Sequence, residues 1–85
     1  MSQFQKALAR IKSIPSDYTY NELKYLLKKF GFAETNKGNT SGSRVRFYRQ
    51  TDNAVIDLHK PHPDDIVPRY AIRNVIDSLE GFGDL

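Results

Sequence analysis

The part of the chain best suited to chemistry is the segment Lys37–Arg49. It opens with a loop rich in glycine and hydroxyl side chains, residues 37–43, and continues into a stretch that alternates basic and apolar residues. Such a loop exposes backbone N–H groups, which are donors for an anion. In a strand, alternate side chains point to opposite faces, so Arg44 and Arg46 would share one face. This pattern indicates a sheet that presents positive charge to a polyanion, with phosphate the first candidate and RNA the second.

The length and composition limit what the chain can be. With 85 residues, we expect a single domain, residues 1–85, and a modest core. The absence of cysteine excludes disulfides, thiolate metal sites and cysteine nucleophiles. No apolar run approaches the roughly 20 residues of a transmembrane helix, and the first residues lack the layout of a secretion signal. We therefore expect a cytoplasmic protein with no membrane contact and no small-molecule cofactor.

The net charge of +3 is divided unevenly along the chain. Residues 1–50 contain ten Lys and Arg against three Asp and Glu, whereas residues 51–85 contain three against seven. A basic half is typical of a surface that binds nucleic acid, and an acidic half would face away from it or toward another partner. The alternative is that folding mixes the two halves into an ordinary surface.

Hydrophobic periodicity predicts an α+β fold in the order α-α-β-β-β-α. Thr19 and Glu22 fit a capping box that starts the second helix, and Gly31 would end it. Pro15 would end the first helix, while Pro68 suits the first turn of the last helix and Gly81 would end that one. The expected helices are 2–14, about 19–30 and about 68–81, and the expected strands are 32–36, 44–50 and 54–59.

The economical arrangement of these elements is a three-stranded antiparallel sheet with helices packed on one face. The apolar residues of the second and third strands would then face the helices. Their polar residues would share the other face, which we expect to carry Arg44, Arg46, Asp57 and His59.

Several motifs, in this order, resemble the HicA-type toxins of bacterial toxin–antitoxin pairs. They are the helix ending in Lys-Phe-Gly-Phe at residues 29–32, the string Thr-Ser-Gly-Ser-Arg-Val-Arg-Phe at 40–47, Ile-Asp-Leu-His-Lys-Pro-His-Pro at 56–63, and a proline-led final helix. The resemblance covers about residues 19–80 and leaves the first helix outside. It implies a fold like that of double-stranded-RNA-binding domains, metal-free cleavage of mRNA (an mRNA interferase), and inhibition by a cognate HicB-type antitoxin.

One position departs from the family pattern. The family's catalytic residue is the histidine of a Gly-Ser-His motif at the start of the second strand, where this chain has Gly42-Ser43-Arg44. Arginine cannot act as a general base, because its pKa exceeds about 12. The family's catalytic role therefore does not transfer to Arg44, whereas His62 matches a loop histidine of the family that is not usually catalytic.

Metal-free RNA cleavage needs a base that deprotonates the ribose 2′-OH and cations over the developing charge. The only histidines are His59 and His62, so one of them would be the base or acid, with Arg44 on the phosphate. The alternatives are a solvated residue at a strand end for His59 and a packed loop residue for His62. The candidate RNA-binding residues are Lys37, Ser43, Arg44, Arg46 and Lys60.

Other residues admit both a functional and a structural interpretation. Tyr18, Tyr20, Tyr25 and Tyr48 could stack on bases, but tyrosines near helix starts more often pack at the core edge. Asp64 and Asp65 make a weak metal site without a third ligand, and we expect them to favour the N-terminus of the last helix. The cluster Lys24, Lys28 and Lys29 is a solvated helix face unless it extends the basic surface of the sheet.

Three functions follow from these patterns. The first is an RNA-cleaving toxin of HicA type, an endoribonuclease. The second is a non-catalytic RNA-binding module on the same fold, which the missing Gly-Ser-His motif favours. The third is a protein-interaction domain whose basic face binds an acidic partner resembling an antitoxin.

Overall fold

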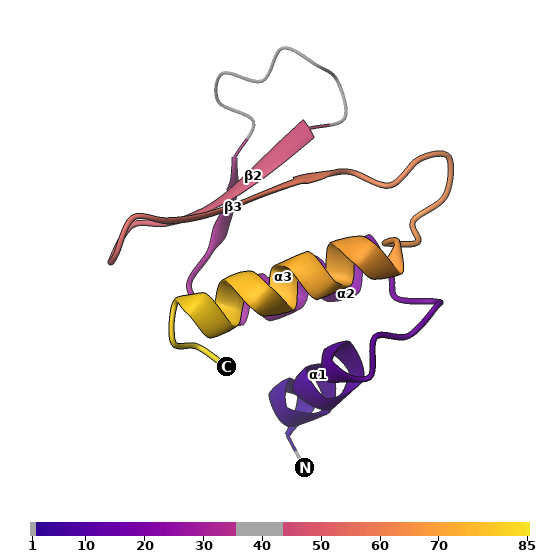
Figure 1. Cartoon of the computed structure of the whole chain (residues 1–85), viewed down its shortest axis with the longest axis horizontal. Coiled ribbons are helices and arrows are strands. Elements are labelled where there is room, and N and C mark those ends of the chain that lie inside the picture. The colour runs from indigo at the N-terminus through magenta and orange to yellow at the C-terminus, as the bar shows by residue number, and fades with distance from the viewer. Residues whose placement is uncertain (1, 36–43) are drawn as a thin grey trace.

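The computed structural model describes residues 2–35 and 44–85. Within these residues lie two helices, three strands and a last helix, and Figure 1 shows how they are arranged. Their bounds are α1 Gln3–Lys12, α2 Tyr20–Lys29, β1 Ala33–Thr35, β2 Arg44–Arg49, β3 Ala54–His59 and α3 Arg69–Gly81. The predicted α+β class and the order α-α-β-β-β-α are confirmed, and β3 has the predicted bounds.

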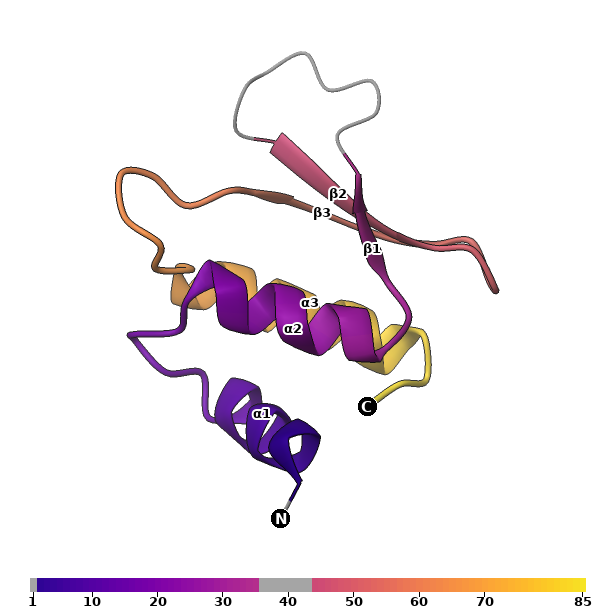
Figure 2. The same cartoon turned by 180° about the vertical axis from the view of Figure 1, so that it is seen from behind.

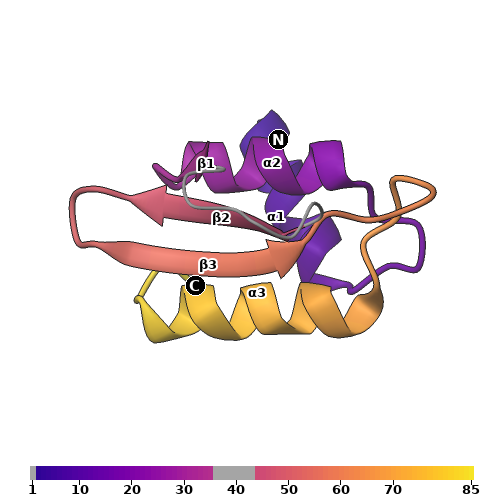
Figure 3. The ribbon, with the colours of Figure 1, turned by 90° about the horizontal axis from the view of Figure 1, so that it is seen from above.

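The strands form an antiparallel sheet in the order β1-β2-β3. Figures 1 and 2 show the sheet as one layer, with α2 and α3 in a second layer beneath it and α1 below those two helices. In the view from above, α2 lies toward β1 and α3 runs alongside β3 (Figure 3). One face of the sheet is therefore covered by α2 and α3, and no described helix covers the other, which we call the open face.

The core lies between the sheet and its helices, because buried and exposed residues alternate along β2 and β3. In β2 every second residue from Val45 is buried, and in β3 Ala54 and Ile56 are. These residues meet the apolar stripes of α2 and α3, which contribute Leu23, Leu26, Leu27, Ile72, Val75 and Leu79. The alternation places the intervening polar residues on the open face.

The capping signals of α2 are confirmed. Thr19 Oγ1 accepts a hydrogen bond from the Glu22 N–H at 3.1 Å, and the Thr19 N–H donates to Glu22 Oε1 at 3.0 Å. At the other end Gly31 has φ +94°, and the Phe32 N–H donates to the Leu27 carbonyl at 2.9 Å. This is a Schellman ending, which requires a residue with positive φ and thereby favours glycine.

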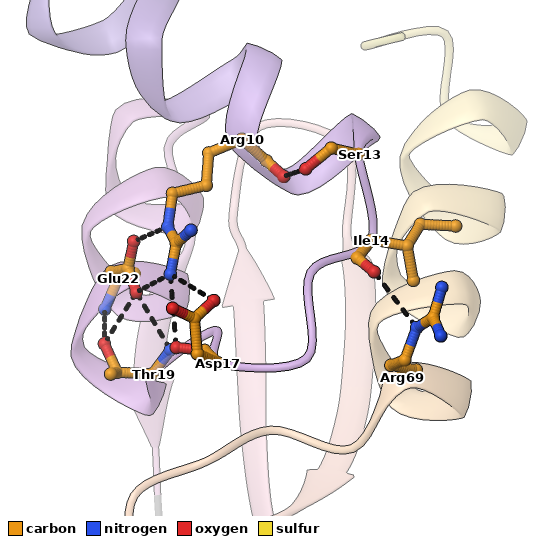
Figure 4. Close-up of polar contacts among 7 residues, drawn as sticks. All are labelled: Arg10, Ser13, Ile14, Asp17, Thr19, Glu22 and Arg69. Carbon is orange, nitrogen blue, oxygen red and sulfur yellow. Dashed lines mark hydrogen bonds and ion pairs between the residues drawn. The ribbon is translucent and has the colours of Figure 1, made fainter.

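The first helix forms a third layer and ends earlier than predicted. It stops at Lys12, and Ile14 takes φ +49° before Pro15. Figure 4 shows the Ile14 carbonyl accepting a hydrogen bond from Arg69 Nε of α3 at 3.1 Å. Ile11 is fully buried, so α1 belongs to the core even though the family resemblance leaves it out.

A single arginine joins α1 to the start of α2. Figure 4 shows Arg10 bonded to the carboxylates of Glu22 and Asp17. The Arg10 guanidinium, followed by the hydrogen bonds from Thr19, holds the pKa of Glu22 below its ordinary value. The capping carboxylate of α2 thereby also fixes the position of α1.

The last helix begins one residue later than predicted and ends at the predicted residue. Pro68 is the N-cap residue and not the first helical one, and Gly81 is the last helical residue. The residue with positive φ is Gly83, at +88°, and the Asp84 N–H donates to the Leu79 carbonyl at 2.8 Å. The prediction that Gly81 ends the helix is therefore confirmed, although the glycine with positive φ, which the Schellman ending requires, is Gly83.

The hydrogen bonds of Asp64 and Asp65 do not involve the N-terminus of α3. The first turn of α3 contains no acidic residue. Asp64 Oδ1 instead accepts from the Ile66 N–H at 3.0 Å, and the Asp65 carbonyl accepts from the Tyr20 N–H at 2.8 Å. Both aspartates shape the loop that joins β3 to α3.

Candidate active site

The strand register brings the predicted polar residues together on the open face. Arg44 lies opposite His59, and Arg46 lies opposite Asp57. All four are exposed. Directly opposed residues of an antiparallel pair have Cβ atoms about 5 Å apart. The expectation that these four residues share the open face is confirmed.

The two arginines of the open face differ in their partners. Arg46 Nε donates to Asp57 Oδ1 at 2.7 Å, and its Nη2 donates to Oδ2 at 3.2 Å. The hydrogen bond from Arg46, and then the charges of Arg46 and Arg44, hold the pKa of Asp57 below its ordinary value. The side chain of Arg44 has no hydrogen bond or ion pair with any residue in the described ranges. Arg44 is thus the guanidinium of this face that is free to bind an added anion.

Both histidines line one groove. It has a volume of about 380 Å³ and is enclosed by β3, by the loop that follows β3, and by α3. We call it the β3–α3 groove. His59 and His62 line it from the strand end and the loop, and neither imidazole is hydrogen-bonded within the described part of the chain. Because His59 also faces Arg44 across the strands, the groove adjoins the basic open face.

Lys60 lines the same groove but extends away from the open face. Its Nζ lies 5.7 Å from the centre of the Tyr20 ring, at the start of α2. The Tyr20 ring is buried on the helix side of the sheet and also lies 5.7 Å from Lys24 Nζ. Lys60 and Arg46 therefore carry charge on different sides of the sheet.

Two predicted RNA-binding residues, Lys37 and Ser43, lie outside the described residues.

The tyrosines divide into core and surface residues. Tyr18 and Tyr20 are 1% and 2% exposed, so the core interpretation holds for them. Tyr48 lies on the open face, where its hydroxyl donates to Asn53 Oδ1 at 2.6 Å. The aromatic residue that sequence reasoning missed is Tyr70 of α3, which is 63% exposed and lines the β3–α3 groove.

The lysine cluster of α2 does not extend the open face. Lys24 pairs with Glu34 of β1 at 3.4 Å. Glu34 lies opposite Phe47, whose side chain faces the helices, so this pair is on the helix side of the sheet. Lys29 lies over the ring of Tyr25. The interpretation of this cluster as a helix face is the one that the structure favours.

In the described part of the chain no three His, Asp or Glu side chains are grouped so that they could hold a metal ion. No helix there is long and apolar enough to cross a membrane.

The fold and the site define a small α+β protein with a basic sheet face beside a groove that contains two histidines. The family described as HicA toxin of bacterial toxin-antitoxin matches residues 20–80, from the start of α2 almost to the end of α3. The chain therefore belongs to the HicA toxin family, and it is the toxin of a toxin–antitoxin pair. No curated protein and no solved structure gives a significant match.

Proposed function

We propose that this toxin cleaves mRNA without a metal ion, and that a cognate antitoxin of HicB type blocks it. The observation that supports this most directly is the convergence of His59 and His62 in the β3–α3 groove, with Arg44 opposite His59. Metal-free cleavage needs a proton acceptor, a proton donor and a cation on the phosphate. These three residues supply all of them.

In the proposed reaction one histidine takes the proton of the ribose 2′-OH. The 2′-oxygen then attacks the adjacent phosphorus, and the bond from phosphorus to the 5′-oxygen breaks. The other histidine gives its proton to that departing oxygen, which leaves a 2′,3′-cyclic phosphate and a 5′-hydroxyl. Imidazole suits both roles because its ordinary pKa of about 6.5 lies near working pH.

Arg44 would act on the phosphate and not on a proton. Its guanidinium can donate two parallel hydrogen bonds to the phosphate oxygens and stabilise the charge that develops on them. In this proposal, Arg44 stands where the family has a catalytic histidine, so the proton transfers move to the two histidines of the groove. We propose that Lys37, Ser43, Arg46 and Lys60 add further contacts to the RNA.

Arg44 also supports a second candidate function, a toxin that binds RNA without cutting it. In that case the protein would bind RNA tightly and in a salt-dependent manner, because phosphate contacts release counterions. A third candidate, a domain that binds only an acidic protein, would show no RNA affinity. For each of these three functions, we propose that the protein acts in the cytoplasm, where mRNA is available.

The deciding experiment expresses His59→Ala, His62→Ala and Arg44→Ala separately and measures growth arrest and RNA cleavage. We expect each histidine variant to lose about 100-fold or more in cleavage rate, the usual range for one acid–base group. Lys12→Ala is the matched control, since Lys12 is exposed on α1, far from the groove. Wild-type protein that leaves RNA intact but binds it would select the second function, and normal rates in both histidine variants would exclude the proposed mechanism.

A further inference from the structure

Three side chains of α3 form a stripe along one wall of the β3–α3 groove. Tyr70, Asn74 and Ser78 follow one another at intervals of four residues, so they lie one above the other on the same side of the helix. All three line the groove between β3 and α3. Figure 3 shows α3 running alongside β3. The stripe therefore faces the strand that ends in His59.

The stripe combines an aromatic ring with groups that form directional hydrogen bonds. Tyr70 is 63% exposed, whereas the other exposed large apolar side chains of the described chain are 36–38% exposed. The Asn74 amide offers both a donor and an acceptor, and the Ser78 hydroxyl offers the same on a smaller scale. None of the three forms a side-chain hydrogen bond with another described residue.

The rest of the groove has an apolar floor and one cationic end. Ile56 and Val75 are buried beneath it, and Ala71 lies beside them on α3. His59, Lys60 and His62 all stand at the end where β3 passes into the following loop. A ligand that fits would be flat and apolar on its faces, polar along one edge, and anionic at one end.

We propose that the β3–α3 groove is a nucleobase pocket that selects the nucleotide next to the cleaved phosphate. The base would stack on Tyr70 and present its edge to Asn74 and Ser78, and its phosphate would lie toward His59, Lys60 and His62. RNA-binding proteins commonly read unpaired bases in this way, by aromatic stacking and hydrogen bonds to the base edge. The volume of about 380 Å³ lies within the usual range of ligand pockets. This inference rests on the proposed function and adds base selectivity to it.

An extended peptide is the other ligand that this place could accept, since no described strand pairs with the outer edge of β3. The composition of the groove favours the nucleotide. A peptide strand would depend mainly on the backbone of β3, whereas the free hydrogen-bonding groups of the stripe lie on α3, opposite that edge.

The test measures binding directly, so that it does not depend on cleavage. Each of the four nucleoside 3′-monophosphates is titrated into the isotope-labelled protein, and affinities and shifted resonances are recorded by NMR. We expect one nucleotide to bind more tightly than the others and to shift resonances of Tyr70 and Asn74. Tyr70→Ala should weaken it about tenfold, within the range for the loss of one stacking contact, while Tyr70→Phe retains it. Asn74→Ala should reduce discrimination among the four nucleotides more than it reduces affinity.

The Tyr70 and Asn74 variants should fold, because both side chains are exposed. Asp77→Ala, on another side of α3, is the matched control. Equal binding by wild type, Tyr70→Ala and Asn74→Ala would overturn the pocket. So would resonances that shift only on the open face. Shifts of β3 backbone amides by a peptide of alternating threonine and glutamate, without any shift by nucleotides, would identify a peptide groove instead.

Cleavage separates this inference from the function on which it rests. If the protein cuts RNA and the cleavage pattern of Asn74→Ala matches that of wild type, the nucleobase pocket is excluded and the proposed RNA cleavage is supported. If the protein does not cut RNA but binds one nucleotide at Tyr70, the proposed RNA cleavage is excluded and the nucleobase pocket is supported.

Discussion

Two regions of the molecule use the same side chain in opposite ways, and a single strand contains both. Arg44 begins β2 on the open face, where its side chain forms no hydrogen bond or ion pair with a described residue. Arg49 ends the strand on the helix side, where it is 8% exposed. Its guanidinium bonds to Asp52 at 2.7 and 2.9 Å, to Asp84 at 2.9 Å and to the Phe30 carbonyl at 3.0 Å.

Arg46 lies between these extremes, exposed but paired with Asp57. Along β2, the guanidinium of Arg44 is therefore available to a ligand, whereas all the bonds of the Arg49 guanidinium are made within the protein. A count of positive charge treats the three arginines as equal. The comparison leads us to expect function at the residue whose side chain has no partner, whereas Arg49 bridges the sheet and the C-terminal tail.

The largest expected effect comes from breaking that bridge. Arg49→Ala leaves the largely buried Asp84 without its partner and removes the group that stacks 4.6 Å from the Phe32 ring. We expect the free energy of unfolding to fall by about 3 kcal/mol, the lower end for loss of one partner of a buried pair. Urea unfolding followed by circular dichroism measures it.

Arg49→Lys is the matched control for the bridge. It retains the charge but not the fork that bonds two carboxylates, so it should recover only part of the loss. RNA affinity of the folded Arg49 variants should equal that of wild type. A specific loss of RNA binding with unchanged stability would mean that Arg49 belongs to the functional surface and that the comparison is wrong.

The next effect tests the other end of the strand. Arg44→Gln should weaken binding of single-stranded RNA about tenfold. A hydrogen bond to a charged group contributes about 1.5–3 kcal/mol, and tenfold corresponds to the lower end of that range. The slope of log affinity against log salt should become shallower by about 0.7, the value for one phosphate contact on a single strand. Fluorescence anisotropy at several salt concentrations measures both quantities.

Arg46→Gln provides the comparison, since Arg46 is already neutralised by Asp57. It should change affinity less than Arg44→Gln does. Equal losses at the two positions would show that pairing with Asp57 does not restrain Arg46.

A smaller effect, of opposite sign, is expected from releasing Arg46. Asp57→Asn removes the carboxylate that holds it and reduces the negative charge beside His59, so RNA affinity should rise a few-fold. The same anisotropy assay detects the gain. Combining Asp57→Asn with Arg46→Gln should abolish it, and a gain that persists in the double variant would assign the effect to charge in general.

Much of this arrangement is present in the sequence as local signals. The capping box of Thr19 and Glu22, the stop at Gly31 and the alternation of β2 and β3 each depend on neighbouring residues, so they could be predicted. The same alternation gave the open face, because register fixes which side chains share it.

The features that were missed depend on contacts between distant residues. Gly81 ends α3 as predicted, but the glycine with positive φ is Gly83, next to Asp84, which Arg49 holds from β2. Tyr70 and Asn74 resemble a solvated helix flank until β3 is seen beside them. Their spacing of four residues from Tyr70 to Asn74 to Ser78, next to the apolar stripe, was the available signal.

The smallest expected effect concerns acid stability and the second structural arginine. Arg10 holds the pKa of Glu22 below its ordinary value, so the folded state binds its proton less readily than the unfolded chain. The stabilisation is therefore complete above about pH 4.3, the ordinary value for glutamate, and is lost as the pH falls through the lower folded pKa. Arg10→Met should lower the melting temperature by a few degrees at pH 7, and by progressively less as the pH falls through the lowered pKa of Glu22 in the folded wild type. A melting-temperature difference that stayed constant across this range in differential scanning calorimetry would mean that Arg10 acts through its apolar stem alone. Its role at the joint of α1 and α2 would then be packing, unlike that of Arg49.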